Sequence, residues 1–186
     1  MRHKVLFCIL ILLILGLLFC IFAFSAQDGN QSADLSQQVS VWLAKALNPA
    51  YMRIAKENVQ NEVIRFLSLP VRKTAHMGEF ALLGALLMGA MLCLRLNMGL
   101  RMLLSFVVTL IFAMADEFHQ TFITGRSGQV RDIFFDAAGA VLGIVLVWVI
   151  SLAVLYGIGC KRLKKAGRGA RRKQNHALYR SAPPPN

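Results

Sequence analysis

The sequence contains little charge, few acidic residues and none of the common motifs of soluble enzymes. Charged residues make up 16% of the 186 residues, and only nine of them are Asp or Glu, against 21 Lys or Arg. Soluble domains carry about 25% charged residues. A P-loop, a Rossmann glycine motif and a nucleophile elbow do not occur. This composition argues against an ordinary soluble enzyme.

Cysteine is also scarce, and its spacing excludes the usual cysteine-based sites. The four cysteines are Cys8, Cys20, Cys93 and Cys160, and no two of them form a C-x-x-C pair. A disulfide framework and a zinc site therefore have no support, and small packing residues are the simpler interpretation.

What the sequence does contain is long apolar runs, in a chain that is 56% hydrophobic. Each run is long enough to cross a hydrocarbon core of about 30 Å, which takes about 20 helical residues. The four runs are Val5–Phe24, Val71–Leu94, Leu100–Ile123 and Ile133–Tyr156. The sequence predicts an all-α, multi-pass protein of the cell membrane with four transmembrane helices.

The first run has a second interpretation, because Arg2 and Lys4 precede it and Ala23-Phe24-Ser25 resembles a cleavage site. A signal peptide has an apolar core of roughly 7–15 residues, which is shorter than this run. An uncleaved first span is the favoured interpretation, and a cleaved signal peptide is the alternative.

Basic residues are concentrated after the last run rather than spread over a nucleic-acid-binding face. Nine of them follow it: Lys161, Arg162, Lys164, Lys165, Arg168, Arg171, Arg172, Lys173 and Arg180. Polybasic segments beside a span mark the cytoplasmic side and attract anionic lipid. We therefore predict an N-in/C-in topology, anionic inner-leaflet lipid as the partner of the tail, and no nucleic acid as a partner.

The remaining chain divides at the ends of the apolar runs. Apolar residues at helical spacing predict two short amphipathic helices over 35–46 and 54–67, with a break at Asn48-Pro49. Pro70 is predicted in the first turn of the second span, where its missing N–H is harmless. The predicted segments are a first span over 1–24, an extracytoplasmic amphipathic helical loop over 25–70, three further spans over 71–158, and a disordered basic tail over 159–186.

Small residues recur every four positions on two of the predicted spans. Ala81, Ala85, Gly89 and Cys93 do so on the second span, and Gly139 and Gly143 do so on the fourth. Small residues at this spacing allow helix backbones to approach closely. Because Gly139 and Gly143 share a helical face with Asp132 and Asp136, the fourth span is expected to turn its carboxylates inward.

Ionisable residues recur near the predicted outer end of three spans. At 1.5 Å per residue, Glu79 lies roughly 21 Å from Cys93 and Asp116 lies roughly 24 Å from Leu100. Asp136 lies roughly 30 Å from Tyr156. Arg72, His76 and Glu79 share one face. Asp116 shares a face with His119 and Gln120, and the loop before the fourth span adds Arg126 and Arg131. Charged groups at such depth are costly and usually functional.

Three hypotheses explain this cluster. Its charges can form a structural ion-pair network, since buried charges are normally paired. They can bind or modify an anionic membrane lipid or envelope precursor, because arginine binds phosphate in bidentate fashion and His or a carboxylate can act as acid or base. They can also serve a proton- or metal-coupled transporter, with His76, Glu79, Asp116 and Asp136 as candidate metal ligands. The residues alone leave the cofactor open.

The order and spacing of these residues resemble the VanZ-like membrane proteins. The segments that carry the resemblance span about 24–147 and are Phe24-Ser25-Ala26-Gln27, Arg72-Lys73-Thr74-Ala75-His76 with Glu79, Asp116-Glu117-Phe118-His119-Gln120, Gly125-Arg126, and Asp132 through Asp136 with Gly139. Two positions depart from the family pattern. Met77 stands where an aromatic is usual, and Phe80 stands where tyrosine is common.

The resemblance implies a four-helix membrane domain in a family named for a protein that lowers susceptibility to the glycopeptide teicoplanin. The candidate catalytic residues are His76, Glu79, Asp116, Glu117 and Asp136. The candidate binding residues are Arg72, Lys73, Gln120, Arg126, Arg131 and Asp132. All except Arg131 also follow from the resemblance.

Overall fold

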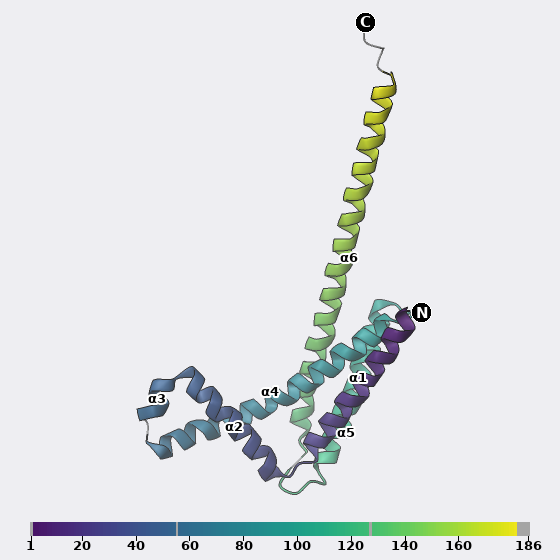
Figure 1. Cartoon of the computed structure of the whole chain (residues 1–186). Coiled ribbons are helices and arrows are strands. Elements are labelled where there is room, and N and C mark those ends of the chain that lie inside the picture. Colours follow the sequence, from purple (N-terminus) through teal and green to yellow (C-terminus); the bar gives the residue numbers. More distant parts are fainter. Residues whose placement is uncertain (1, 55, 127, 182–186) are drawn as a thin grey trace. The chain divides into compact units, whose positions relative to one another are not determined.

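A computed structural model describes residues 2–54, 56–126 and 128–181. The described residues are all-helical (Figure 1), and the helices are α1 Arg2–Ser25, α2 Gly29–Leu47, α3 Pro49–Ile54, α4 Glu57–Leu92, α5 Met98–Gln120 and α6 Val130–Ser181. The chain divides into two compact units, Met1–Val147 and Trp148–Asn186, so that α6 begins in the first and ends in the second. The charged residues predicted to form the site all lie in the first unit.

Four helical stretches are long and apolar enough to cross a membrane: His3–Ser25, Glu57–Leu92, Met98–Gln120 and Val130–Ile158. The structure buries only 17–33% of the apolar window in each. Large side chains such as Leu12 and Phe19 are 68% and 75% exposed. Because each helix satisfies its own backbone and turns apolar side chains outward, lipid can solvate these faces. The predicted all-α fold with four spans is confirmed, whereas the N-in/C-in topology stays a prediction.

The core of the first unit lies where α1, α4 and α5 meet. Its buried apolar side chains are Ile14 and Ile21 from α1, Phe80, Leu83, Leu87 and Ala90 from α4, and Ala113 from α5. Phe80 is fully buried. Three helices that pack on one another in this way hold their polar ends in a fixed arrangement, which positions the site described below.

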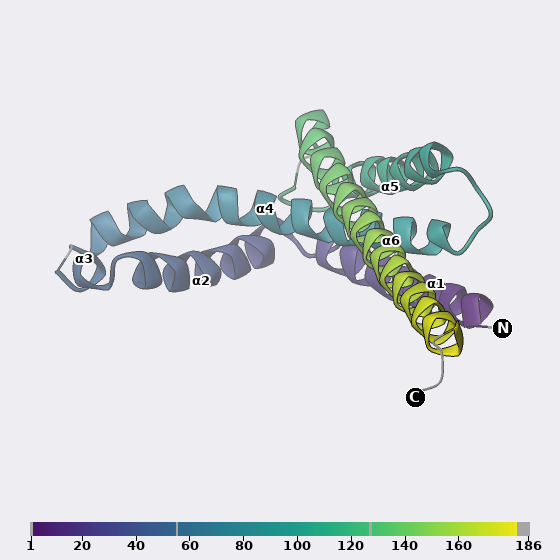
Figure 2. The ribbon, with the colours of Figure 1, turned by 90° about the horizontal axis from the view of Figure 1, so that it is seen from above.

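The helix α2 packs against the N-terminal half of α4, and the short helix α3 packs against α2 (Figures 1 and 2). Ala44, Met52 and Ile64 form a second small apolar core there. The buried face of α2 is otherwise serine: the Ser36 Oγ donates to the Ser32 carbonyl at 2.7 Å, and the Ser40 Oγ donates to the Ser36 carbonyl at 2.6 Å. Small residues with satisfied hydroxyls allow α2 to lie close to α4.

The prediction that the second span begins at Pro70 is wrong, because α4 is one helix of 36 residues with Pro70 inside it. The predicted second short helix is the N-terminal part of α4. Proline inside a helix costs about 3 kcal/mol. The packing of Ile64 against α2 helps to hold the turn before Pro70 in the helix. The predicted break at Asn48-Pro49 is confirmed, since α2 ends at Leu47.

The small residues of α4 and α6 form a close backbone contact, as predicted. A Cβ added at Gly139 would lie 2.1 Å from the Met77 carbonyl oxygen, and one added at Gly143 would lie 1.8 Å from the Ala81 carbonyl oxygen. No side chain fits at either position. The start of α6, and with it Asp132 and Asp136, is therefore fixed against α4 by glycine.

This contact predicts that Gly143→Ala destabilises the protein by about 1–3 kcal/mol, since the methyl group must push α6 away from α4. The matched control is Gly157→Ala on the same helix, where a Cβ meets nothing within 4 Å. The control is expected to be neutral or slightly stabilising because alanine is the better helix former. Thermal unfolding of the two variants in detergent measures the difference, and equal midpoints would contradict the close contact.

Composition predicts disorder for the basic segment after the last span. In the structure this segment is instead part of α6, which ends at Ser181. Lys, Arg, Ala and Leu are good helix formers, and a helix that is already formed extends without a new nucleation step. Residues 182–186 lie outside the described residues. The cytoplasmic location of the tail and its attraction to anionic lipid stay predictions.

Candidate functional site

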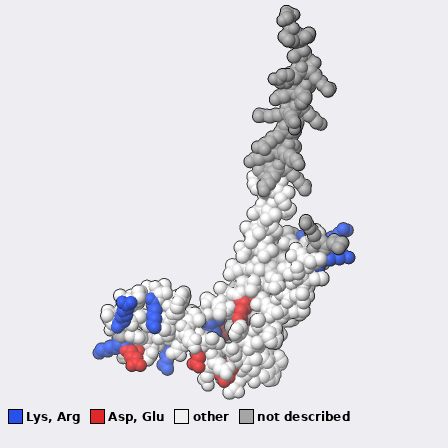
Figure 3. Space-filling model, in the orientation of Figure 1, with Lys and Arg blue, Asp and Glu red and all other residues white. Residues whose placement is uncertain are grey.

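Polar side chains from four helices meet near one end of the spans in the first unit. They come from the end of α1, the middle of α4, the end of α5, the loop over 121–129 and the start of α6. Most of the surface drawn in Figure 3 is uncharged, and charged side chains show on it at few places. Five of the nine acidic residues of the chain belong to this cluster: Glu79, Asp116, Glu117, Asp132 and Asp136.

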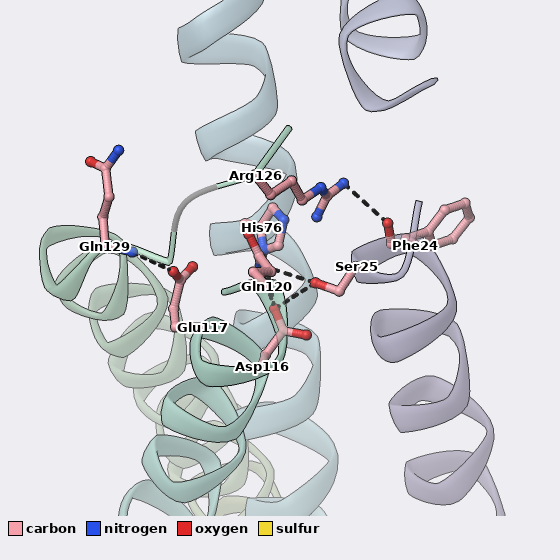
Figure 4. Close-up of polar contacts among 8 residues, drawn as sticks. All are labelled: Phe24, Ser25, His76, Asp116, Glu117, Gln120, Arg126 and Gln129. Carbon is pink, nitrogen blue, oxygen red and sulfur yellow. Dashed lines mark hydrogen bonds and ion pairs between the residues drawn. The ribbon is translucent and has the colours of Figure 1, made fainter. Parts of the chain in front are cut away.

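A hydrogen-bonded network around Asp116 ties α5 to the end of α1 (Figure 4). Asp116 is fully buried. The Ser25 Oγ donates to Asp116 Oδ2 at 2.8 Å, and Gln120 Nε2 donates to the same oxygen at 2.9 Å and to the Ser25 Oγ at 3.0 Å. Sequence reasoning missed Ser25 as a site residue. Its signal was its place at the end of the first apolar run, inside a segment that carries the family resemblance.

His76 extends this network toward the surface. Its Nδ1 atom lies 4.0 Å from Asp116 Oδ2, too far for a hydrogen bond, and its side chain is 20% exposed. A protonated His76 would be attracted to the carboxylate at this distance. His76 and Asp116 therefore form a loose pair in which only His76 can reach a ligand.

Two glycines hold the loop that carries Arg126 against the turn between α1 and α2. The Gly29 N–H donates to the Thr124 carbonyl at 3.0 Å, and a Cβ added at Gly29 would lie 2.2 Å from the Gly125 carbonyl oxygen. Gly125 has φ +75°, a conformation that suits glycine. The loop thereby brings Arg126 to the end of α1, where its Nη2 donates to the Phe24 carbonyl at 3.1 Å.

Burial, and after it the neighbouring Arg72 guanidinium, lowers the pKa of Arg126 from its ordinary value. Arginine nevertheless remains protonated in proteins. The neighbouring carboxylates of Asp116, Glu117 and Glu79 act in the opposite direction on this pKa. The two guanidinium groups nevertheless repel each other, and an anion placed between them would relieve that repulsion.

Two further contacts hold acidic side chains of the site in place. The backbone N–H of Gln129 donates to Glu117 Oε2 at 2.9 Å, which joins the loop to α5. Lys73 on α4 forms an ion pair with Asp132 on α6, and its Nζ lies 4.9 Å from the centre of the Phe135 ring. Neither of the ion pairs found among the described residues includes the Arg126 guanidinium.

A cavity of about 320 Å³ lies between α4, α5, α6 and the loop. Nine predicted site residues line it: Arg72, Lys73, His76, Glu117, Gln120, Arg126, Arg131, Asp132 and Asp136. Leu69, Gly125, Gln129 and Phe135 complete its wall. We call this space the main cavity. Four of its lining residues are permanent cations, and pockets that bind small ligands start at about 300 Å³.

Glu79 and Asp116 do not line the main cavity, although their depth predicted them beside Asp136. Glu79 lines a second space of about 150 Å³ between α1, α2 and α4, and Asp116 lines neither space. Helical rise gives the depth of a residue but not the direction in which its side chain leaves the helix. Asp116 is therefore placed to support Ser25 and Gln120 rather than to contact a ligand.

Several buried polar atoms of the site have no hydrogen-bond partner within the described part of the chain. These atoms are His76 Nδ1, Asp116 Oδ1, Arg126 Nε and Nη1, and Asp136 Oδ2. Buried polar groups are normally hydrogen-bonded, and each exception in a native structure calls for an explanation. A self-contained ion-pair network would satisfy these groups internally. Their lack of partners favours a site that is completed by something outside the chain.

The candidate metal ligands His76, Glu79, Asp116 and Asp136 do not come together. Within residues 2–54, 56–126 and 128–181, no group of three or more His, Cys, Asp or Glu side chains is arranged to hold a metal ion. The acidic residues are spread over two adjoining spaces and a buried network, and the main cavity is lined by four cations as well as by carboxylates.

The fold and the site define a small multi-pass membrane protein with a charged cavity near one end of its spans. The chain belongs to the VanZ/LLP1 family, whose sequence model matches residues 7–151. That range includes all eleven predicted site residues and ends before the basic tail. Neither the curated proteins nor the solved structures gave a significant match.

Proposed function

We propose that this VanZ-like membrane protein binds the anionic head group of an envelope lipid or lipid-linked precursor in the main cavity. The observation that carries the proposal is Arg126, a cation lining the cavity whose buried Nε and Nη1 atoms have no acceptor among the residues that the structure describes. Arg72 and Arg131 line the same space. Phosphate is the natural ligand for such a group, because a guanidinium donates two parallel hydrogen bonds to its oxygens.

The location of the cavity supports a lipid as the source of that phosphate. Its walls come from the ends of apolar spans, and Leu69 and Phe135 line it beside the cations. In the N-in/C-in topology that the basic tail predicts, this end of the spans lies in the outer leaflet. The head group of a lipid in that leaflet could then reach the main cavity from the side, without crossing the membrane.

The two alternative functions have less support. A structural ion-pair network explains Lys73 and Asp132 but not the unpartnered atoms of Arg126. A transporter needs a polar path toward the other side of the membrane. Ser105 and Thr109 of α5 are the buried hydroxyls in that direction, and each donates to a backbone carbonyl of its own helix at 2.8 Å. Their hydroxyl protons are therefore already engaged.

Chemical modification of the bound lipid is a second candidate function, favoured by His76. Its side chain lines the main cavity, and its Nδ1 atom faces the Asp116 carboxylate at 4.0 Å. With Nδ1 turned toward that carboxylate, Nε2 is the nitrogen that could accept a proton from a ligand. His76→Gln should then abolish turnover of a bound lipid while lipid retention stays, whereas a pure binding protein shows no turnover in either form.

The binding proposal predicts that Arg126→Ala lowers the amount of anionic lipid that copurifies with the protein about tenfold or more. Hydrogen bonds to charged groups contribute about 1.5–3 kcal/mol each, and tenfold corresponds to about 1.4 kcal/mol. The matched control is Arg65→Ala, which removes an exposed arginine of α4 outside both spaces. Lipids extracted from gently purified protein are quantified by mass spectrometry. Equal anionic lipid in Arg126→Ala and the control would contradict the proposal.

The family resemblance extends the proposal to glycopeptide susceptibility. If the bound lipid is a cell-wall precursor, expression of the chain should raise the teicoplanin concentration that inhibits a susceptible host. The Arg126→Ala variant should lose this effect at equal protein level. If expression of the wild-type chain leaves the inhibitory teicoplanin concentration unchanged, the binding function is separate from any role in susceptibility.

A further inference from the structure

A second space adjoins the main cavity and differs from it in lining. This groove of about 150 Å³ lies between the end of α1, the start of α2 and the middle of α4. Its apolar lining residues are Phe24, Leu35, Val39, Val71 and Ala75. Its polar lining residues include Gln27, Ser32, Ser36 and Glu79. We call this space the α2–α4 groove.

The groove and the main cavity share three lining residues, Arg72, His76 and Arg126. In Figure 4, Arg126 and His76 lie between the end of α1 and the end of α5. A phosphate held by the two arginines would therefore sit at the junction of both spaces. On one side of it lies a charged cavity, and on the other side lies the apolar groove.

We propose that the α2–α4 groove holds the first part of one hydrocarbon chain of the phospholipid whose head group occupies the main cavity. This inference rests on the proposed function. A phospholipid has an apolar chain beginning a few bonds from its phosphate, and the junction places an apolar groove beside the arginines. The main cavity suits the chain less well, because seven of its 13 lining residues are charged, against three of the 12 that line the groove.

The construction of α2 supports this occupant. Ser32 and Ser36 are small and mostly buried, so they leave room beside α2. The Ser36 hydroxyl donates to a carbonyl of its own helix and needs no water as a partner. Leu35 and Val39 are 46% and 49% exposed, and Phe24 is 51% exposed. Half-exposed apolar side chains along the groove can be contacted by a hydrocarbon chain that reaches it from outside the protein. Gln27 and Glu79 can hydrogen-bond the ester and hydroxyl groups that lie between phosphate and chain.

Binding in the groove would add little hydrophobic affinity, because a hydrocarbon chain that is already in lipid gains little from entering another apolar space. The groove would instead contribute to specificity. The expected consequence is a fixed position of the chain, which a photoreactive lipid can report. Ala75→Trp fills the groove from an exposed position on α4, so the fold is expected to remain intact. The matched control is Leu82→Trp, which places the same ring on a 52% exposed site of α4 outside both spaces.

The test uses phosphatidylglycerol with a diazirine on the first carbons of one acyl chain, bound to the full-length protein in detergent. Crosslinked peptides are expected from 32–39 of α2 and 71–79 of α4, and Ala75→Trp should lower their yield about tenfold while Leu82→Trp leaves it unchanged. Retention of unlabelled phosphatidylglycerol is measured in parallel. If retention is normal but these peptides do not crosslink, or crosslink equally in Ala75→Trp, the chain lies elsewhere and the inference is wrong. If the wild-type protein retains no anionic lipid, the proposed function fails and this inference fails with it.

Discussion

Asp116→Ala is expected to lower the accumulation of folded protein strongly and to reduce stability by about 2–4 kcal/mol. The side chain is fully buried and accepts hydrogen bonds from Ser25 and Gln120, so its removal leaves buried donors without an acceptor. It also releases the end of α1 from α5. For a chain of this size such a loss corresponds to a fall in the unfolding midpoint of roughly 5–15 °C. Expression level and thermal unfolding in detergent measure it.

The control for this prediction is Asp116→Asn, which keeps an acceptor oxygen at the same position. Because Asp116 lines neither the main cavity nor the α2–α4 groove, the asparagine variant should accumulate and retain anionic lipid close to the wild-type level. If Asp116→Asn accumulates but loses all lipid binding, the carboxylate acts on the ligand and the structural role assigned to it is incorrect. Wild-type stability of Asp116→Ala would also contradict that role.

Gly29→Ala is expected to weaken anionic-lipid retention about tenfold or more, although it changes no charged residue. The added Cβ would lie 2.2 Å from the Gly125 carbonyl oxygen, so the loop over 121–129 must move away from the turn after α1. Arg126 lies directly after Gly125 and moves with it. Its hydrogen bond to the Phe24 carbonyl is then lost, together with the geometry that aims the guanidinium at the cavity.

The matched control is Gly16→Ala on α1, where a Cβ meets nothing within 4 Å. Lipid retention of both variants is measured by the same mass spectrometry as for Arg126→Ala. The expected order is wild type and Gly16→Ala together, with Gly29→Ala well below them. Normal retention by Gly29→Ala would show that the ligand does not depend on the position of the loop.

The sequence was sufficient to predict the spans and to single out nine of the residues that line the main cavity, because both depend on strong local signals. Four apolar runs predict four spans, and charged residues beside such runs are rare enough to mark a site. Glycines four residues apart on α6 predicted a close helix contact, and the structure shows that α4 is the partner. These signals come from single helices and do not require knowledge of the tertiary arrangement.

Features that depend on tertiary contacts were not predictable in the same way. Pro70 is a reliable sign of a helix start only when nothing else supports the preceding turn, and here α2 supports it. The separation of Glu79 from Asp136 depends on the direction of each side chain. Ser25 entered no candidate list, because a single serine at the end of an apolar run has no distinctive pattern. Its role appears only when α1 is placed against Asp116.

The most direct test of the central claim is to locate an anionic head group on the protein. Phosphatidylglycerol carrying a photoreactive group on its head group is bound to the purified full-length protein, and crosslinked peptides are identified by mass spectrometry. The account predicts crosslinks within 69–76 of α4 and 120–136 of the loop and α6, with a loss of about tenfold in Arg126→Ala and none in Arg65→Ala. Crosslinks confined to the outer faces of the spans, or equal in Arg126→Ala and Arg65→Ala, would contradict it.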